Sequence, residues 1–161
     1  MFLRASLAAI ALTIVAAMAF VRLAPVDAAK WHVRPHSIVP EAAGWRSLTL
    51  NPPAATPGAV PMPGGAYALE IIGGTVASEV LRRLDAIARA TPRTTVLAGT
   101  PESGLMTWET RSLLWGFPDY ITAEALQDGL FVRFSLVARS RFGDNDLGVN
   151  AKRLSYWLLQ L

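Results

Sequence analysis

The spacing of apolar positions after residue 65 predicts two helices. Over 76–90 these positions recur at three- and four-residue steps, which is typical of a helix with one buried stripe, and Thr75 precedes it as an expected N-cap. A second helix is expected to begin near Leu147 and to run to the end of the chain, where four apolar residues share one face. These residues are Leu154, Trp157, Leu158 and Leu161.

Between the two helices, short runs rich in β-branched and aromatic residues predict four strands, and a fifth run precedes the first helix. The turn signals "TPESG", "GFPD" and "QDG" separate the four and leave no room for intervening helices, so the strands are expected to be antiparallel. The predicted fold is α+β: an antiparallel sheet of about four to five strands, packed on one face by two helices, after an N-terminal membrane helix. A ferredoxin-like sandwich and a helix-grip sheet both fit. The five runs are 66–72, 93–99, 104–117, 119–127 and 129–141.

The N-terminal segment contains 17 uncharged, mostly apolar residues from Ala5 to Val21, between Arg4 and Arg22. Its length lies at the lower end of what spans a bilayer and slightly above that of a signal-peptide core, and "AMA" and "VDA" offer cleavage sites. We favour an uncleaved single-span anchor in a bacterial inner membrane, with the N-terminus in the cytoplasm and the domain in the periplasm. The expected division is 1–24 anchor or signal segment, 25–65 Pro-rich extended tether and 66–161 α+β domain.

Most prolines fall between Ala24 and Gly65, which predicts a tether or an extended wrap over the domain. This segment holds both histidines, His32 and His36, and Pro35 between them argues against the helix that would pair them on a metal. No metal and no cofactor is therefore expected. We expect an aromatic and histidine segment near the membrane surface instead.

Composition excludes several classes of site. The absence of cysteine excludes disulfides, thiolate metal sites and a cysteine nucleophile. The chain has 15 Lys and Arg against 12 Asp and Glu, with no dense basic block, so no nucleic-acid partner is expected. The G-x-S-x-G, Walker, H-E-x-x-H and dinucleotide-binding motifs are also missing.

Alternation in the last predicted strand separates a core face from a charged face. Leu130, Val132, Phe134, Leu136 and Ala138 are expected under the helices. The opposite face would present arginines whose planar guanidinium groups suit a carboxylate or an anionic head group. A solvated face with loosely paired charges and a protein-binding surface remain alternatives. The predicted ligand-binding residues are Arg133, Arg139, Arg141 and Asn150.

The stretch "RSRFGDNDLGVNAKR" that follows has two interpretations. It fits a calcium loop poorly, because the glycine is one place early and the twelfth position is Ser155 rather than glutamate. We favour a structural corner in which Gly143 ends the strand and the Asp146 carboxylate caps the last helix. The alternative is an anion site at the start of that helix.

The quoted segments "ETRSLLWGFPDYI" and "SRFGDNDLGVNAKR" resemble the bacterial and plastid family catalogued as domain of unknown function 1499. The similarity covers roughly 74–161, and "APVDAAKWHV" resembles the members with one N-terminal apolar segment. The resemblance implies a bacterial envelope protein and leaves the chemistry open. The structural motif that it marks consists of Ser140, Arg141, Gly143, Asp146, Gly148, Val149, Asn150 and Arg153.

Two functions from different classes follow. The first is a membrane-anchored, non-enzymatic binding or structural module of the envelope, which recognises an anionic small molecule, a lipid head group or a protein partner. The second is a hydrolase-type enzyme that uses carboxylates as acid and base. The candidate carboxylates are Glu109, Asp119, Asp144 and Asp146.

Overall fold

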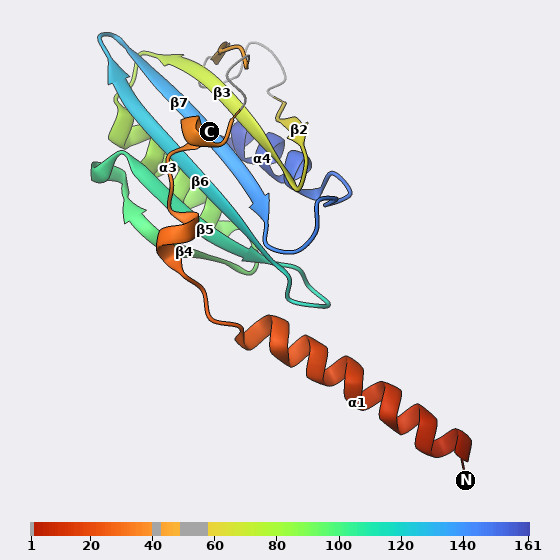
Figure 1. The fold of residues 1–161 in the computed structure, drawn as a ribbon. Coiled ribbons are helices and arrows are strands. Elements are labelled where there is room, and N and C mark those ends of the chain that lie inside the picture. The colour runs from red at the N-terminus through yellow and green to blue at the C-terminus, as the bar shows by residue number, and fades with distance from the viewer. Residues whose placement is uncertain (1, 40–42, 49–57) are drawn as a thin grey trace.

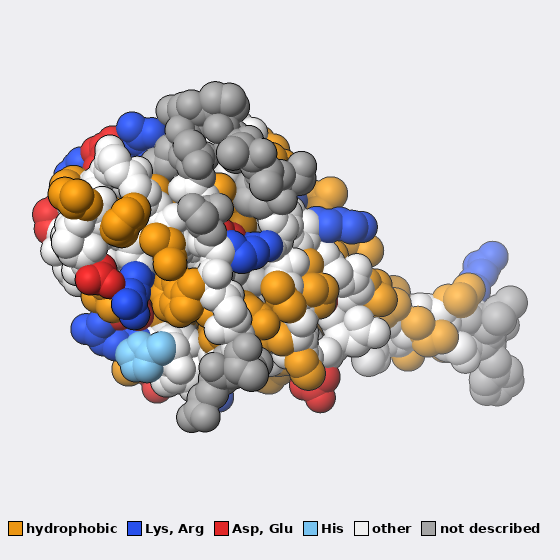
Figure 2. Space-filling view, turned by 90° about the horizontal axis from the view of Figure 1, so that it is seen from above, with side chains coloured by type: hydrophobic (Ala, Val, Ile, Leu, Met, Phe, Trp, Pro, Cys, Tyr) orange, Lys and Arg blue, Asp and Glu red, His pale blue; other side chains and the backbone are white. Residues whose placement is uncertain are grey.

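The computed structural model describes residues 2–39, 43–48 and 58–161. The most proline-dense part of the expected tether, "NPPAATP", lies outside the described residues. Helix α1 (Phe2–Leu23) projects away from the rest of the chain, and most of its described apolar side chains are exposed, whereas Val21 near its end is buried (Figures 1 and 2). It is long and apolar enough to cross a membrane, by a criterion that a signal sequence also meets.

A seven-stranded sheet forms the body of the molecule, in the order β1-β3-β7-β6-β5-β4 with β2 paired to β3. All neighbouring strands are antiparallel except β1, which runs parallel to β3. The predicted α+β class is therefore confirmed, with more strands than the four to five expected. The strands are β1 (Arg46–Leu48), β2 (Val60–Met62), β3 (Gly65–Gly73), β4 (Thr94–Thr100), β5 (Leu105–Arg111), β6 (Pro118–Asp128) and β7 (Phe131–Ser140).

Helices α3 (Ala77–Ala90) and α4 (Val149–Gln160) cover one face of this sheet (Figure 1). The amphipathic patterns explain why: the predicted stripe of α3 and the predicted face of α4 are both buried in the main core. In that core the indole rings of Trp108 and Trp157 meet edge to face at 5.9 Å. The strand residues beneath the helices include Ile121, Val132, Phe134 and Leu136.

The other face of the sheet, here called the open face, receives the chain that follows α1. The short helix α2 (Ala28–Trp31) and the 3-10 turn η1 (Pro35–Ser37) lie in front of β5, β6 and β7 (Figure 1). We call residues 24–39 the strap. A second 3-10 turn, η2 (Pro101–Ser103), joins β4 to β5.

Three local expectations were wrong. Val76, not Thr75, precedes α3, and the amide of Ala77 instead donates to the Gln127 side chain at 3.0 Å. Leu130 lies in the β6–β7 turn and is 84% exposed, because the chain reverses before its side chain can reach the core. The expected strand 104–117 ends at Arg111, since the following residues fold into a turn in which the amide of Ser112 donates to the carbonyl of Phe117 at 2.9 Å.

Candidate functional site on the open face

Trp31 anchors the strap to the open face. Its indole ring stacks on the ring of Tyr120, with centroids 4.1 Å apart, and the guanidinium of Arg139 lies 4.9 Å from the Trp31 ring centroid. The carbonyl of Trp31 accepts hydrogen bonds from Arg139 Nη2 at 2.8 Å and from Thr122 Oγ1 at 3.1 Å. One residue of the strap thus uses both an aromatic and a backbone contact to hold it on β6 and β7.

Two polar atoms are buried under the strap without a hydrogen-bond partner among the described residues: the Tyr120 hydroxyl and Arg139 Nε. Burial raises the pKa of Tyr120, and the nearby negative charge of Glu109 raises it further. Burial also lowers the pKa of Arg139, which remains charged because free arginine titrates far above neutral pH. The strap therefore covers part of a positively charged side chain and partly shields it from water.

The polar side chains of the strap also bond to the open face. His32 Nδ1 lies 2.9 Å from Thr107 Oγ1, and burial lowers the pKa of His32. Farther along, Arg34 pairs with Glu124, whose other carboxylate oxygen lies 3.6 Å from His36 Nδ1. The Glu124 side chain is only 3% exposed, so these partners offset the cost of burying its charge.

Arg141 contacts the start of the strap. Its guanidinium donates to the carbonyls of Ala24 at 3.4 Å and Pro25 at 3.1 Å, and lies 5.3 Å from the Phe142 ring centroid. Two of the three arginines predicted to bind a ligand, Arg139 and Arg141, therefore donate hydrogen bonds to backbone carbonyls of the strap.

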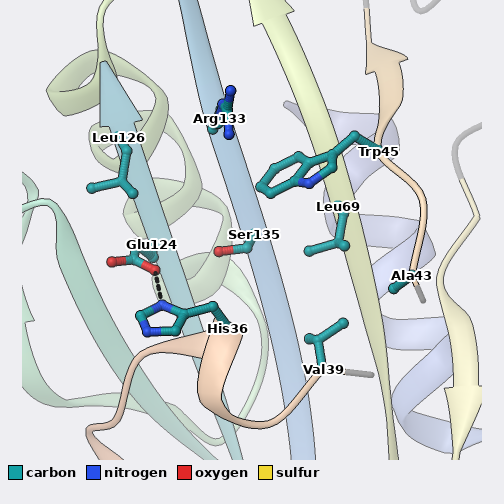
Figure 3. A pocket seen from close by; sticks show the side chains of 9 residues that line it. All are labelled: His36, Val39, Ala43, Trp45, Leu69, Glu124, Leu126, Arg133 and Ser135. Atoms are coloured by element: carbon teal, nitrogen blue, oxygen red, sulfur yellow. Dashed lines mark ion pairs between the residues drawn. The ribbon is translucent and has the colours of Figure 1, made fainter. Parts of the chain in front are cut away.

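A hollow of about 300 Å³ remains on the open face beside the strap (Figure 3). Its polar side is formed by Glu124, Ser135 and His36, and its apolar side by residues of the strap, β3 and the stretch before β1. A small cavity with a few polar groups and an apolar wall is the usual form of a small-molecule site. The lining residues are His36, Val39, Ala43, Trp45, Leu69, Glu124, Leu126, Arg133 and Ser135.

Arg133 lies at one end of this hollow (Figure 3). Its Nε donates to Asp128 Oδ2 at 2.8 Å, and its guanidinium lies 5.9 Å from the Trp45 ring centroid. Within the described residues, its two Nη atoms make no hydrogen bond. They are therefore available to an oxygen-bearing ligand.

On the opposite side of the sheet, Asp119 is the centre of a closed polar network. One of its carboxylate oxygens accepts from Ser140 Oγ at 2.8 Å and the other from Arg153 Nη1 at 3.0 Å. Asn150 is fully buried, donates to Ser140 Oγ at 3.1 Å and accepts from Arg153. The network ties the ends of β6 and β7 to α4, and each member satisfies the others.

The turn that leads into α4 explains the rest of the motif. The Asp146 carboxylate accepts from the amides of Gly148 at 3.0 Å and Asn150 at 2.8 Å. Gly143 and Gly148 have φ angles of +84° and +73°, which favour glycine. The helix begins at Val149 rather than near Leu147, and its first amides are occupied by Asp146.

The structure does not bring the four predicted ligand-binding residues together. Arg139 and Arg141 bind the strap, Asn150 belongs to the Asp119 network behind the sheet, and only Arg133 lines the hollow. A shared ligand for the four stays a prediction.

The acidic residues considered for catalysis also have separate environments. Glu109 pairs with Arg111 on the open face, whereas Asp119 lies on the helix side. Asp146 caps α4 and Asp144 is exposed. The Ser140 hydroxyl bonds to Asp119 and Asn150, so its partners here are an acceptor and an amide rather than an imidazole base.

Sequence reasoning missed the residues that build the hollow. Glu124 and Ser135 are paired in the β6–β7 register and lie on the same face of the sheet. Pairing the two predicted strands as a hairpin could have indicated that these side chains are neighbours. The roles of Trp31 and Trp45 had no such signal, since they depend on where a proline-rich segment folds back.

A family model described as "Protein of unknown function (DUF1499)" matches residues 54–161. The chain belongs to this family. The DUF1499 match includes the Asp119 network and the strands under the hollow, and it begins after the strap. No curated protein and no solved structure matches the chain.

Proposed function

We propose that this DUF1499 protein is a non-enzymatic binding module held at the cell membrane by α1. In this proposal, 1–24 is a single-pass anchor in a bacterial inner membrane, 25–65 connects it to the domain, and 66–161 is the α+β domain on the periplasmic side. The apolar composition of α1 and its projection from the domain support the anchor.

The observation that carries the binding proposal is the hollow of Figure 3. It combines a buried carboxylate with a hydroxyl and arginine Nη atoms that make no hydrogen bond among the described residues, opposite an apolar wall that includes Trp45 and Leu69. A purely structural face would bury these groups against one another, as the Asp119 network does.

The chemistry of the lining supports a small amphipathic ligand with a carboxylate or phosphate group. The anion would bind the Nη atoms of Arg133, whose planar geometry suits two oxygens. A hydroxyl or amide on the ligand would bond to Ser135 and Glu124, and its apolar part would pack on Trp45. Glu124 repels the anion little, because Arg34 already neutralises it.

Native mass spectrometry of the full chain, extracted gently from its own membrane, tests this proposal. We expect a bound mass in the wild type that is lost in Arg133→Ala and kept in Arg83→Ala, since Arg83 pairs with Glu79 on the far side of the sheet. A wild type without bound mass, or a bound protein in its place, would reject the small-molecule site.

A further inference from the structure

Large apolar side chains are exposed at the end of the domain where β5, β6 and β7 meet the turns beside α1. Leu113 is 75% exposed, Leu114 67% and Leu147 82%, and Phe117 and Phe142 are exposed by about 40%. We call these five residues and Trp115 the apolar rim. Large contiguous apolar surfaces on a folded protein usually mark a contact site.

The rim residues form one surface. The rings of Trp115 and Phe117 are 6.1 Å apart, and those of Phe117 and Phe142 are 5.7 Å apart. A hollow of about 410 Å³ is lined by five of the six, all but Leu113, which adjoins Leu114 in the chain. The rim therefore spans two turns that lie far apart in sequence.

Contacts fix this rim to the last turn of α1. Arg22 Nη2 donates to the carbonyl of Leu114 at 3.0 Å, and Arg111 Nη1 lies 3.5 Å from the carbonyl of Val21. Gly116 allows the approach, because a side chain there would meet Arg22 at 2.9 Å. The position of the rim is thus set by the end of the helix.

The length of α1 then indicates where the apolar rim lies relative to the bilayer. The candidate span Arg4–Leu23, with an arginine near each end, has 20 residues and would be about 30 Å long, the thickness of the hydrocarbon core. Arg22 would lie at the membrane surface, and the turn bonded to it would lie there too. Leucine, tryptophan and phenylalanine are the side chains favoured at that boundary.

We propose that the apolar rim inserts into the head-group and acyl boundary of the bilayer that α1 crosses, so that the domain rests on the membrane. The occupant is lipid because the rim is continuous with a lipid-spanning helix. The proposal depends on the anchoring role of α1 and not on the ligand hollow.

The chain has no cysteine, so single cysteines can be labelled specifically. We would reconstitute the full chain in phosphatidylcholine vesicles, with an environment-sensitive fluorophore at Leu113→Cys or Leu147→Cys, and measure quenching by lipids that carry a nitroxide on the acyl chain. Leu130→Cys is the control: it is 84% exposed at the far end of β6, about 33 Å away along 11 residues. Val15→Cys in α1 reports the anchor separately.

Labels at Leu113 and Leu147 should be quenched several-fold more strongly than the label at Leu130. Quenching at Val15 combined with water-like emission at Leu113 would reject the insertion of the rim and would still support α1 as the anchor. Blue-shifted emission at Leu113 without quenching would mean that protein covers the rim, which also rejects the proposal. Loss of quenching at Val15 would reject the anchor and the rim together.

Discussion

The indole ring of Trp31 lies on the phenol ring of Tyr120, with planes inclined by 24° and centroids 4.1 Å apart. This contact joins a residue just beyond the apolar helix to the middle strands of the sheet. It converts a segment that could have been a loose connection into a strap held against the domain.

Replacing Trp31 by Ala should release the strap. The stack and the cation–π contact with Arg139 each contribute roughly 0.5–1.5 kcal/mol, so we expect docking to weaken by about 1–3 kcal/mol. Trypsin should then cleave after Lys30 about tenfold or more faster than in the wild type. Trp31→Phe keeps an aromatic ring and should be intermediate.

Trp45→Ala is the matched control, because Trp45 is exposed and contacts Arg133 rather than the strap's anchor. Equal cleavage rates in wild type and Trp31→Ala would show that the stack does not hold the strap.

Arg153→Ala should destabilise the fold by about 2–4 kcal/mol, because it leaves the Asp119 carboxylate without its cationic partner. The two side chains are only 14% and 16% exposed, so solvent cannot replace the lost contact. Chemical unfolding of the full chain in mild detergent, followed by near-ultraviolet circular dichroism, measures the change. Arg89→Ala removes a pair in which the Arg89 side chain is 60% exposed, and Asp85 keeps its hydrogen bond from the Trp108 indole, so the free energy of unfolding should change by less than about 1 kcal/mol.

If Arg153→Ala lowers the free energy of unfolding by no more than Arg89→Ala does, the Asp119 network does not stabilise the fold.

Glu70 should make stability depend on pH. Burial raises the pKa of Glu70 above its ordinary 4.5, although Arg46 opposes the shift. Above pH 4.5 and below the raised pKa, the folded chain keeps a proton that the unfolded chain has released. The free energy of unfolding therefore falls as pH rises through this range and is constant above it.

Glu70→Gln removes this titration. The melting temperature of the wild type minus that of Glu70→Gln should fall as pH rises from 4.5 and then level off, because only the wild type loses this stabilisation. A difference that is flat from pH 4 to 7 would contradict the assigned shift.

Periodicity was sufficient for the helices and the main strands, because the buried stripes of α3 and α4 and the alternation of β7 are local properties of the sequence. The Asp146 carboxylate was also foreseen at the start of α4, since capping depends on neighbours in the chain.

The open face could not be assigned in the same way. The sequence predicts Arg139 and Arg141 as ligand-binding residues on a strand face, but the partners that the structure gives them lie more than 100 residues away in the strap. Strand β1 likewise pairs with β3, although β1 is a three-residue strand between proline-containing stretches that favour an extended tether. Long-range pairing of this kind leaves no pattern within a short window of sequence.

Hydrogen–deuterium exchange of the full chain in lipid nanodiscs tests the docked strap most directly. A docked strap should show slow exchange for the amides of His32, Ile38 and Val39, which are hydrogen-bonded within the strap, and much faster exchange in the Trp31→Ala, Arg139→Ala double variant. Exchange of these amides in the wild type at the rate of a free peptide would contradict it. The strap would then be a loose tether, and Arg139 and Arg141 would be open to a ligand.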